Sequence, residues 1–278
     1  MQQSKLNIGL TGINSILCKS FISKYSKKYK LSLYKYDIND INKFKKWMML
    51  NKNIDVFINF AAIVSTKRCF RNKIIALKTN YKSVLNILNL YKKYNKTKIT
   101  NLKYFLALSS SHVFSPNNEK LSEKSKKIPP NYYGITKLKM EKGLLKKNKF
   151  FKIGIGRIFN YYNKSYKNGY FINDIINILD SKKNKIYLTD VDTYRDYIDI
   201  KDIINALSHM VDNKLNGDYN ICSGKRFYLK KIVKNLNHMF KKKLHFINTN
   251  KKSIIGDNSK LKKTGWKLKH ILTYNKIV

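Results

Sequence analysis

The stretch LNIGLTGINS, residues 6–15, carries the strongest indication of a fold class in this chain. Its first six residues are of the apolar kind that forms a buried strand, and a segment with helical periodicity follows Gly9 and Gly12. Glycines at such a turn let the backbone come close to a pyrophosphate, and the next helix offers N–H groups at its N-terminus. We therefore expect Gly9, Gly12 and Ile13 to bind a dinucleotide, with Ser15 in place of the third glycine of a GxxGxxG pattern.

The same rhythm of apolar runs and amphipathic segments continues through the first half of the chain. Apolar runs predict strands at residues 6–11, 31–36, 55–60, 103–109 and 151–158. Apolar residues at three-to-four spacing predict helices at residues 15–25, 44–50 and 84–94. Strands separated by helices require right-handed crossovers and a parallel sheet that is covered on both faces. The predicted fold is therefore α/β, a doubly wound parallel sheet of the Rossmann type.

The rhythm changes near residue 160. The elements expected after it are a helix at 171–179, a strand at 186–188, and helices at 203–211 and 229–240. We expect a dinucleotide-binding domain at 1–160 and a smaller α/β substrate-binding lobe at 161–278. No repeat or low-complexity linker separates them, so the boundary is soft and elements of the two can interleave.

Composition places the chain among globular proteins. With 278 residues, 43% of them hydrophobic, it can bury a sizeable core. Its three cysteines, Cys18, Cys69 and Cys222, are widely separated, which favours a reducing compartment over a disulfide framework. No segment reaches the roughly eighteen apolar residues that cross a bilayer, so we expect no membrane partner and a cytoplasmic location. The five histidines lack the paired spacing of metal ligands, so no metal site is expected.

The formal net charge of +42 comes from 58 Lys and Arg against 16 Asp and Glu. Such an excess usually suggests a polyanionic partner such as nucleic acid. Nearly all the basic residues are lysine, however, and the chain is equally rich in Asn, Ile and Tyr, which share A/T-rich codons. Base-reading interfaces favour arginine. We therefore interpret the charge as codon bias and expect no specific nucleic-acid partner.

Two adjacent tyrosines lie in the segment NYYGITKLK, residues 131–139, directly after two prolines. In a helix, residues four apart share a face, whereas residues five apart diverge by roughly 140°. Tyr133 can therefore face Lys137, and Tyr132 cannot. An ammonium beside a phenol favours the phenolate and lowers the tyrosine pKa below its usual value of about 10. Tyr133 and Lys137 are thus a candidate proton-transfer pair.

Small and polar residues follow two of the predicted strands. The strand at 55–60 leads into Ala61 and Ala62, which either leave room for a cofactor across the strand end or serve packing alone. The strand at 103–109 leads into Ser110 and His112. Ligands of open α/β sheets bind at the carboxyl ends of the strands, so we expect these side chains to lie at the ligand-binding edge.

These segments occur in an order and at intervals that resemble one known family. GLTGINS, NFAA, SSSHVF and YGITK are similar to motifs of the extended short-chain dehydrogenase/reductase family, which comprises nucleotide-sugar epimerases, dehydratases and reductases. In the second half, GRIFNYYN, YRDYIDIKDI, YNICSGK and DNSKLKKTGWK resemble further segments of this family. The likeness extends over residues 5–267, nearly the whole chain, and specifies the family better than any one substrate.

The resemblance implies a catalytic set. Tyr133 would be the acid/base, and Lys137 would lower the pKa of Tyr133 and hold the nicotinamide ribose. Ser110 would donate a hydrogen bond to the reacting oxygen. Asn80, in the segment TNYKSV, matches a helix asparagine that supports this site in the family.

The resemblance also implies ligand contacts outside that set. Asn160 and Arg195 match positions that contact the nucleotide diphosphate in many relatives, a task that suits the bidentate arginine side chain. The alternative for Arg195 is a structural Arg–Asp pair. Asp37 would bind the adenosine ribose and select NAD, or belong to a later Asp-x-x-Asp segment on the adenine side. The expected cofactor is NAD or NADP, and Asp37 favours NAD.

One departure from the family pattern concerns the reaction. Dehydratases of the family typically place Asp-Glu directly after the active-site hydroxyl residue, and this chain has Ser111 and His112 there. The difference argues against 4,6-dehydration. His112 occupies a place where some epimerase-reductases carry an extra catalytic residue, so it would move a proton on carbon. The alternative is an ordinary histidine at the edge of a turn.

Together these features predict an NAD(P)-dependent epimerase or ketoreductase that acts on a nucleotide-diphosphate sugar through Ser110, Tyr133 and Lys137. By family resemblance we also expect a homodimer. A non-catalytic dinucleotide-sensing or scaffold protein on the same fold is the alternative, and a nucleic-acid-binding protein is a third hypothesis that rests on charge alone.

Overall fold

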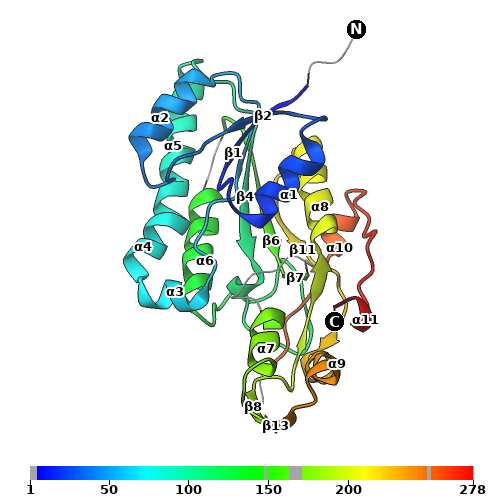
Figure 1. Cartoon of the computed structure of the whole chain (residues 1–278). Helices are drawn as coiled ribbons and strands as arrows, with labels where there is room; N and C mark the ends of the chain where they lie inside the picture. Colours follow the sequence, from blue (N-terminus) through cyan, green and yellow to red (C-terminus); the bar gives the residue numbers. More distant parts are fainter. Residues whose placement is uncertain (1–4, 147–148, 163–170, 249–251, 278) are drawn as a thin grey trace. The chain divides into compact units, whose positions relative to one another are not determined.

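The computed structural model describes residues 5–146, 149–162, 171–248 and 252–277 (Figure 1). The chain divides into two compact units that alternate along the sequence. The first unit consists of Met1–Ser115, Lys126–Arg157 and Ile204–Tyr219. The second consists of Pro116–Ser125, Ile158–Ile203 and Asn220–Val278.

A six-stranded sheet with the order β11-β6-β4-β3-β1-β2 forms the centre of the first unit. β1 pairs in parallel with β2 and β3, and β3 pairs in parallel with β4. All residues of β3 and β4 are buried, as expected for strands that are covered on both faces. This sheet confirms the predicted fold class. Its strands are β1 (Asn7–Thr11), β2 (Lys30–Leu33), β3 (Val56–Asn59), β4 (Tyr104–Ser110), β6 (Lys152–Ile158) and β11 (Gly217–Ile221), of which β6 and β11 end in the second unit.

Helices cover the sheet on both sides. Figure 1 shows α2 to α6 on one side of the sheet and α1 with α8 on the other. The core between the sheet and α2, α5 and α6 is rich in aromatic rings, and Phe57 and Phe105 on neighbouring strands lie 5.1 Å apart between ring centroids. The helices are α1 (Ile16–Tyr25), α2 (Ile41–Leu50), α3 (Thr66–Arg71), α4 (Lys73–Leu77), η1 (Lys78–Lys82), α5 (Ser83–Lys96), η2 (Ser111–Val113), α6 (Tyr132–Leu144) and α8 (Ile200–Asp212), which begins in the second unit.

The second strand is shorter than the sequence predicts. The apolar pattern predicts a strand at 31–36, but β2 ends at Leu33. Tyr34 is buried outside the strand, where its ring packs against Phe44 and its hydroxyl donates to the backbone oxygens of Asp37 and Asp40. The apolar pattern cannot distinguish a strand residue from an aromatic residue that is buried just beyond the end of the strand, so the predicted strand is too long.

Helices α3 and α4 lie where no helix is predicted. Their large apolar side chains Phe70, Ile74 and Ile75 are exposed, so the segment lacks the buried apolar stripe on which a periodicity argument depends. The following turn, η1, is a π-helix that joins α4 to α5. Such insertions within helices occur frequently at functional sites.

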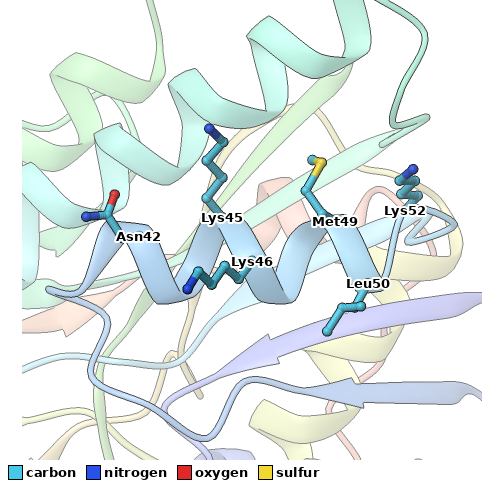
Figure 2. A pocket seen from close by; sticks show the side chains of 6 residues that line it. All are labelled: Asn42, Lys45, Lys46, Met49, Leu50 and Lys52. Atoms are coloured by element: carbon cyan, nitrogen blue, oxygen red, sulfur yellow. The ribbon is translucent and has the colours of Figure 1, made fainter.

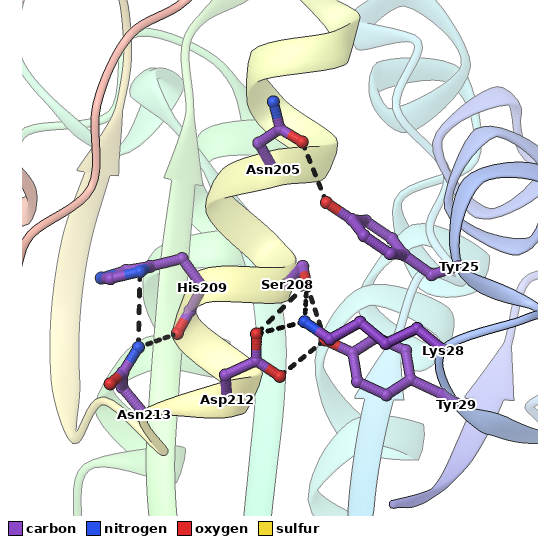
Figure 3. Close-up of polar contacts among 8 residues, drawn as sticks. All are labelled: Tyr25, Lys28, Tyr29, Asn205, Ser208, His209, Asp212 and Asn213. Atoms are coloured by element: carbon purple, nitrogen blue, oxygen red, sulfur yellow. Dashed lines mark hydrogen bonds and ion pairs between the residues drawn. The ribbon is translucent and has the colours of Figure 1, made fainter. Parts of the chain in front are cut away.

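A polar cluster joins the end of α1 and the turn that follows it to α8 (Figure 3). The buried Tyr29 hydroxyl lies 2.6 Å from the Ser208 hydroxyl and donates to Asp212 over 2.8 Å. Lys28 forms an ion pair with the same carboxylate, and Tyr25 donates to Asn205 over 2.9 Å. Burial raises the pKa of Tyr29 to about 12, so its hydroxyl remains a donor at neutral pH. These bonds connect the helix after β1 to the helix before β11.

The second unit is built from two-stranded pairings around a separate apolar core of α7 and α9. The predicted helices at 171–179 and 229–240 are confirmed, and the predicted strand at 186–188 lies within β8. Its elements are β5 (Lys120–Leu121), β7 (Asn160–Tyr162), α7 (Phe171–Leu179), β8 (Lys185–Thr189), β9 (Tyr194–Arg195), β10 (Tyr197–Asp199), β12 (Phe227–Tyr228), α9 (Leu229–Phe240), β13 (Lys243–Ile247), β14 (Ile255–Gly256), α10 (Ser259–Lys262) and α11 (Tyr274–Ile277).

We expect Tyr29→Phe to destabilise the protein by about 1–2 kcal/mol, because the change removes one buried hydroxyl and leaves Ser208 and Asp212 with one bond fewer. Tyr25→Phe is the matched control, since Tyr25 is only partly buried and makes one such bond. Urea unfolding of the two variants measures the difference. Equal losses would show that the Tyr29 hydroxyl contributes nothing specific to the α1–α8 packing.

Candidate active site

The strand order singles out the adjacent strands β1 and β3. The chain passes from β1 to its neighbour β2 and then returns to β3 on the other side of β1, which makes this pair the topological switch point where open α/β sheets bind ligands. The two strands end side by side at Thr11 and Asn59, whose side chains hydrogen-bond over 2.6 Å. This end of the sheet is therefore the ligand-binding edge that the topology predicts.

The glycine turn closes tightly over this edge. Gly12 has φ +66, and a Cβ there would collide with the backbone of Phe60 and Ala61, so only glycine fits. Gly9 instead lies within β1, where a Cβ would meet the side chains of Ile54 and Trp47. The turn thus brings the first and third strand ends close together. Gly9 is buried, whereas Gly12 and Ile13 are partly exposed and Asn14 is exposed.

Ser15, which replaces the third glycine of the pattern, caps α1. Its hydroxyl accepts a hydrogen bond from Cys18 N over 3.3 Å. A capping serine satisfies one N–H group of the first turn and leaves the helix N-terminus at the strand edge. The departure from GxxGxxG is therefore compatible with an anion at this helix end.

Asp37 lies four residues beyond the end of β2 and is exposed. Its Oδ1 accepts hydrogen bonds from the backbone and side-chain nitrogens of Asn39, both over 2.9 Å. Ala61 and Ala62, after β3, are partly exposed. The contact of these three residues with a cofactor stays a prediction.

Helix α6 presents Tyr133 and Lys137 on one buried face. Tyr133 is 8% exposed and Lys137 2%, whereas Tyr132 is only partly buried and lies beneath the ammonium of Lys73. Lys137 Nζ donates to the backbone oxygen of Leu108 in β4 over 2.8 Å. Burial lowers the pKa of Lys137 to about 8, and the nearby Glu141 and Cys69 partly offset this effect. The lysine is therefore cationic at neutral pH, but close to its titration point.

Asn80 connects the π-helix η1 to the first turns of α6. Its side-chain oxygen accepts from Ile63 N, and its amide donates to Ile63 O and to the Thr136 hydroxyl. Thr136 in turn donates to the backbone oxygen of Tyr133 over 2.7 Å. Asn80 thus fixes α6 through protein contacts, and Thr136, which the sequence analysis did not single out, completes the connection.

Ser110 and His112 lie next to the start of α6. Ser110 is the last residue of β4, and its hydroxyl accepts from His112 N over 3.3 Å. The His112 ring meets the Tyr133 ring edge-on, with centroids 5.6 Å apart. Its Nδ1 lies 2.7 Å from the side-chain nitrogen of Asn131, the residue that caps α6. The structure therefore brings together the predicted Ser110, His112 and Tyr133, and adds Asn131.

A buried ion pair underlies the far end of the same helix face. Arg157 donates to both carboxylate oxygens of Glu141, over 2.9 and 2.8 Å, and also pairs with Asp218. Glu141 is one turn beyond Lys137 and is one of the groups that favour the charged lysine. The four-residue spacing from Lys137 to Glu141 can be read from the sequence. The pairing of Glu141 with Arg157 cannot, because Arg157 lies in β6, far along the chain.

Asn160 and Arg195 belong to the second unit. Asn160 donates to the backbone oxygen of Asp196 over 3.4 Å. Arg195 Nη1 donates to the Thr193 hydroxyl and to the backbone oxygens of Tyr194 and Lys252. Burial lowers the pKa of Arg195, and the nearby Tyr197 and Asp190 partly offset this effect. The structural Arg–Asp pair therefore stays open as the alternative to a ligand contact.

Asp196 itself anchors a different part of the second unit. Its buried carboxylate accepts hydrogen bonds from the backbone and hydroxyl of Ser223 and from the backbone nitrogens of Gly224 and Gly256. Burial raises the pKa of Asp196 to about 6, although these donors counteract the effect. The Arg-Asp segment that the sequence shares with the family therefore contains a partly buried arginine and a fully buried aspartate that is a structural anchor.

The ligand-binding edge fits a dinucleotide cofactor by two observations. At Gly12 the turn lies so close to the backbone of Phe60 and Ala61 that a Cβ would fill the space between them. The buried hydroxyl of Ser109 has no hydrogen-bond partner within the described residues. The described residues contain no group of three His, Cys, Asp or Glu placed to hold a metal ion. They also contain no helix of the length and apolarity needed to span a bilayer.

A surface hollow of about 820 Å³ lies along α2 and is separate from these residues (Figure 2). Lysines dominate its lining, which consists of Asn42, Lys45, Lys46, Met49, Leu50 and Lys52. None of the predicted site residues contributes to it. We therefore assign the site from the strand edge and α6 and not from this hollow.

Residues 17–272 match the family described as GDP-mannose 4,6 dehydratase, and the chain belongs to this family. Among curated proteins, GDP-6-deoxy-D-mannose reductase of Pseudomonas aeruginosa is 23% identical over 232 residues, covering 77% of this chain and 75% of that protein. These matches confirm the predicted family of nucleotide-sugar epimerases, dehydratases and reductases.

Solved structures of the same fold include enzymes with either nicotinamide cofactor. RMD from Pseudomonas aeruginosa complexed with NADPH has a TM-score of 0.81 at 20% identity, and the match covers 98% of this chain and 96% of that chain. UDP-glucose 4-epimerase from Thermus thermophilus, in complex with NAD, has a TM-score of 0.81 at 15% identity with the same coverage. At these identities the likeness establishes the fold.

We expect Gly134→Ala to destabilise the protein by about 1–3 kcal/mol, because the added Cβ would collide with the backbone oxygen of His112. Gly143→Ala is the matched control in the same helix, where the Cβ meets only the side chain of Leu85 and alanine has the better helix propensity. Thermal unfolding compares the two. If Gly134→Ala is as stable as Gly143→Ala, the close approach of α6 to His112 does not exist in solution.

Proposed function

We propose that this protein is an NAD(P)-dependent ketoreductase that reduces a keto group on a nucleotide-diphosphate sugar. The observation that carries the proposal is the buried face of α6, where Tyr133 and a lysine of lowered pKa lie beside the end of β4. The reductase from Pseudomonas aeruginosa supports reduction over the other reactions of the family. Ser111 and His112, in place of the Asp-Glu pair of dehydratases, count against 4,6-dehydration.

In this proposal, the residues of the chain move the proton and stabilise the oxygen. When bound, the reduced nicotinamide supplies a hydride to the keto carbon. Tyr133 gives its hydroxyl proton to the keto oxygen, so that C=O becomes CH–OH and the tyrosine is left as phenolate until it is reprotonated from solvent. The cationic Lys137 stabilises that phenolate, and Ser110 donates a hydrogen bond to the same substrate oxygen.

The cofactor would lie across the β1–β3 edge, with its pyrophosphate at the Gly12 turn and the N-terminus of α1. Ile13, Ala61 and Ala62 are the partly exposed neighbours of that position. Asp37 would hydrogen-bond the adenosine ribose, which favours NAD, while the relative with 20% identity binds NADPH. Asn160 and Arg195 of the second unit would bind the diphosphate of the sugar nucleotide.

An epimerase is the second candidate, because UDP-glucose 4-epimerases are among the proteins with this fold. A non-catalytic scaffold is disfavoured, because burying an ammonium costs stability and a scaffold would gain nothing from it. The expected homodimer stays a prediction. Exposed apolar side chains on α3 and α4, which are Phe70, Ile74 and Ile75, are a face that a second copy could cover.

We expect Tyr133→Phe to lower kcat by about 100-fold or more, because the acid/base is lost, and to leave cofactor affinity within a few-fold. Tyr132→Phe is the matched control and should retain nearly the wild-type rate, since Tyr132 does not share the face of Lys137. The assay follows nicotinamide absorbance with 4-keto sugars carried on GDP, UDP or dTDP, each with NADH and NADPH.

Cofactor and sugar-nucleotide binding are measured separately by thermal shift, because a ligand at a hundred times its Kd stabilises by about 2.7 kcal/mol. Binding of a cofactor without turnover of any sugar nucleotide would support the non-catalytic alternative. Equal loss of rate in Tyr132→Phe and Tyr133→Phe would remove Tyr133 from the acid/base role.

A further inference from the structure

The orientation of the Asn131 side chain is determined by the helix that it caps. Asn131 precedes α6 in an extended conformation, and its Oδ1 accepts a hydrogen bond from Gly134 N over 3.0 Å. A backbone N–H can only donate, so the amide atom that faces Gly134 must be the oxygen. The other amide atom is then the NH2 group, which can only donate.

This NH2 group lies 2.7 Å from Nδ1 of His112. Because the amide nitrogen donates, Nδ1 must accept, and it therefore carries a lone pair instead of a proton. A neutral imidazole has one N–H, which is then on Nε2. The cap of α6 thus settles which of the two ring nitrogens of His112 is protonated.

We infer that Asn131 holds His112 as the Nε2–H tautomer, so that His112 acts at the active site as a hydrogen-bond donor and not as a base. The second half of this inference rests on the proposed function. Asn131 is then a positioning residue, which acts through His112 and through the start of α6. His112 is a substrate-binding residue.

The ring is held from other directions as well. His112 N donates to the Ser110 hydroxyl, and the ring packs edge-on against Tyr133. The backbone oxygen of His112 is so close to Gly134 that no side chain fits between them. A 180° flip of the ring would move Nδ1 away from Asn131 and break this contact. A proton on Nδ1 would point at the amide protons of Asn131, which is unfavourable.

The tautomer separates the two mechanisms that the sequence leaves open. To abstract a proton from a sugar carbon, His112 would need a lone pair directed at the substrate. The lone pair of Nδ1 is occupied by Asn131, and Nε2 carries the proton. His112 can therefore polarise a substrate oxygen but cannot epimerise the carbon next to a keto group, which agrees with net reduction.

The direct test is two-bond ¹H–¹⁵N correlation NMR of the histidine rings at about pH 8, above the usual histidine pKa of about 6.5. The spectrum of His112→Gln assigns the His112 ring among the five histidines. In the wild type, we expect Hδ2 of His112 to correlate with a protonated nitrogen, which is the pattern of the Nε2–H tautomer. A proton on Nδ1 in the wild type would overturn the inference.

Asn131→Asp is the diagnostic variant. Aspartate is an equally good N-cap, so Gly134 keeps its acceptor and the thermal midpoint should stay close to that of the wild type. Its second oxygen can only accept, which favours a proton on Nδ1 of His112. We expect the ring pattern to change to the Nδ1–H or the doubly protonated form. An unchanged pattern in Asn131→Asp would show that Asn131 does not set the tautomer.

The catalytic half has its own test once a substrate is turned over. His112→Gln keeps a side-chain donor and should retain a larger share of kcat than His112→Phe. When the wild type reacts in deuterated water, the product should carry no deuterium on any ring carbon that the hydride does not reach. Ring-carbon deuterium that disappears in His112→Gln would make His112 a base. Absence of turnover with every substrate would count against the proposed function, while the NMR result would still decide the tautomer.

Discussion

The ammonium of Lys137, buried inside the first unit, is the constraint on which this site depends. A buried lysine is tolerated only if its charge has partners, and Nζ finds one in the backbone oxygen of Leu108 at 2.8 Å. That bond ties α6 to β4, whose next residues end at Ser110. The position of Tyr133, the proposed acid/base, relative to the strand edge is therefore set by the same contact that stabilises the lysine charge.

The rest of α6 is fixed at several points along its length. Asn131 caps its first turn, and Asn80 reaches it through Thr136. Glu141, at the next turn after Lys137, is held by the buried Arg157. Removing one partner of a buried ion pair strongly destabilises a protein, whereas replacing the whole pair with apolar residues is often neutral. The value of the Glu141–Arg157 pair therefore lies in fixing geometry. The helix is thus held rigidly, as the proposed catalysis by Tyr133 and Lys137 would require.

Much of this arrangement is readable from the sequence, and the unreadable part has a physical reason. The strands of the sheet follow from runs of apolar residues, and the face shared by Tyr133 and Lys137 follows from helix geometry alone. The end of β2 does not, because Tyr34 is buried outside the strand. The contacts of Asn131 with His112 and of Glu141 with Arg157 join segments whose spacing in sequence carries no signal. Asn131, after two prolines and before a helix, does however have the pattern of an N-cap.

A pH titration of the lysine ¹³Cε resonances in the protein without ligand determines whether Lys137 is a buried, cationic lysine on the face of α6 that it shares with Tyr133. We expect the Lys137 resonance to titrate with a pKa of about 8, below the ordinary lysine value of about 10.4, and to be absent from Lys137→Met. Glu141→Gln should lower that pKa further, because Glu141 favours the charged lysine. If Lys137 instead titrates at the ordinary lysine value of about 10.4, its side chain lies in water and not against the backbone oxygen of Leu108.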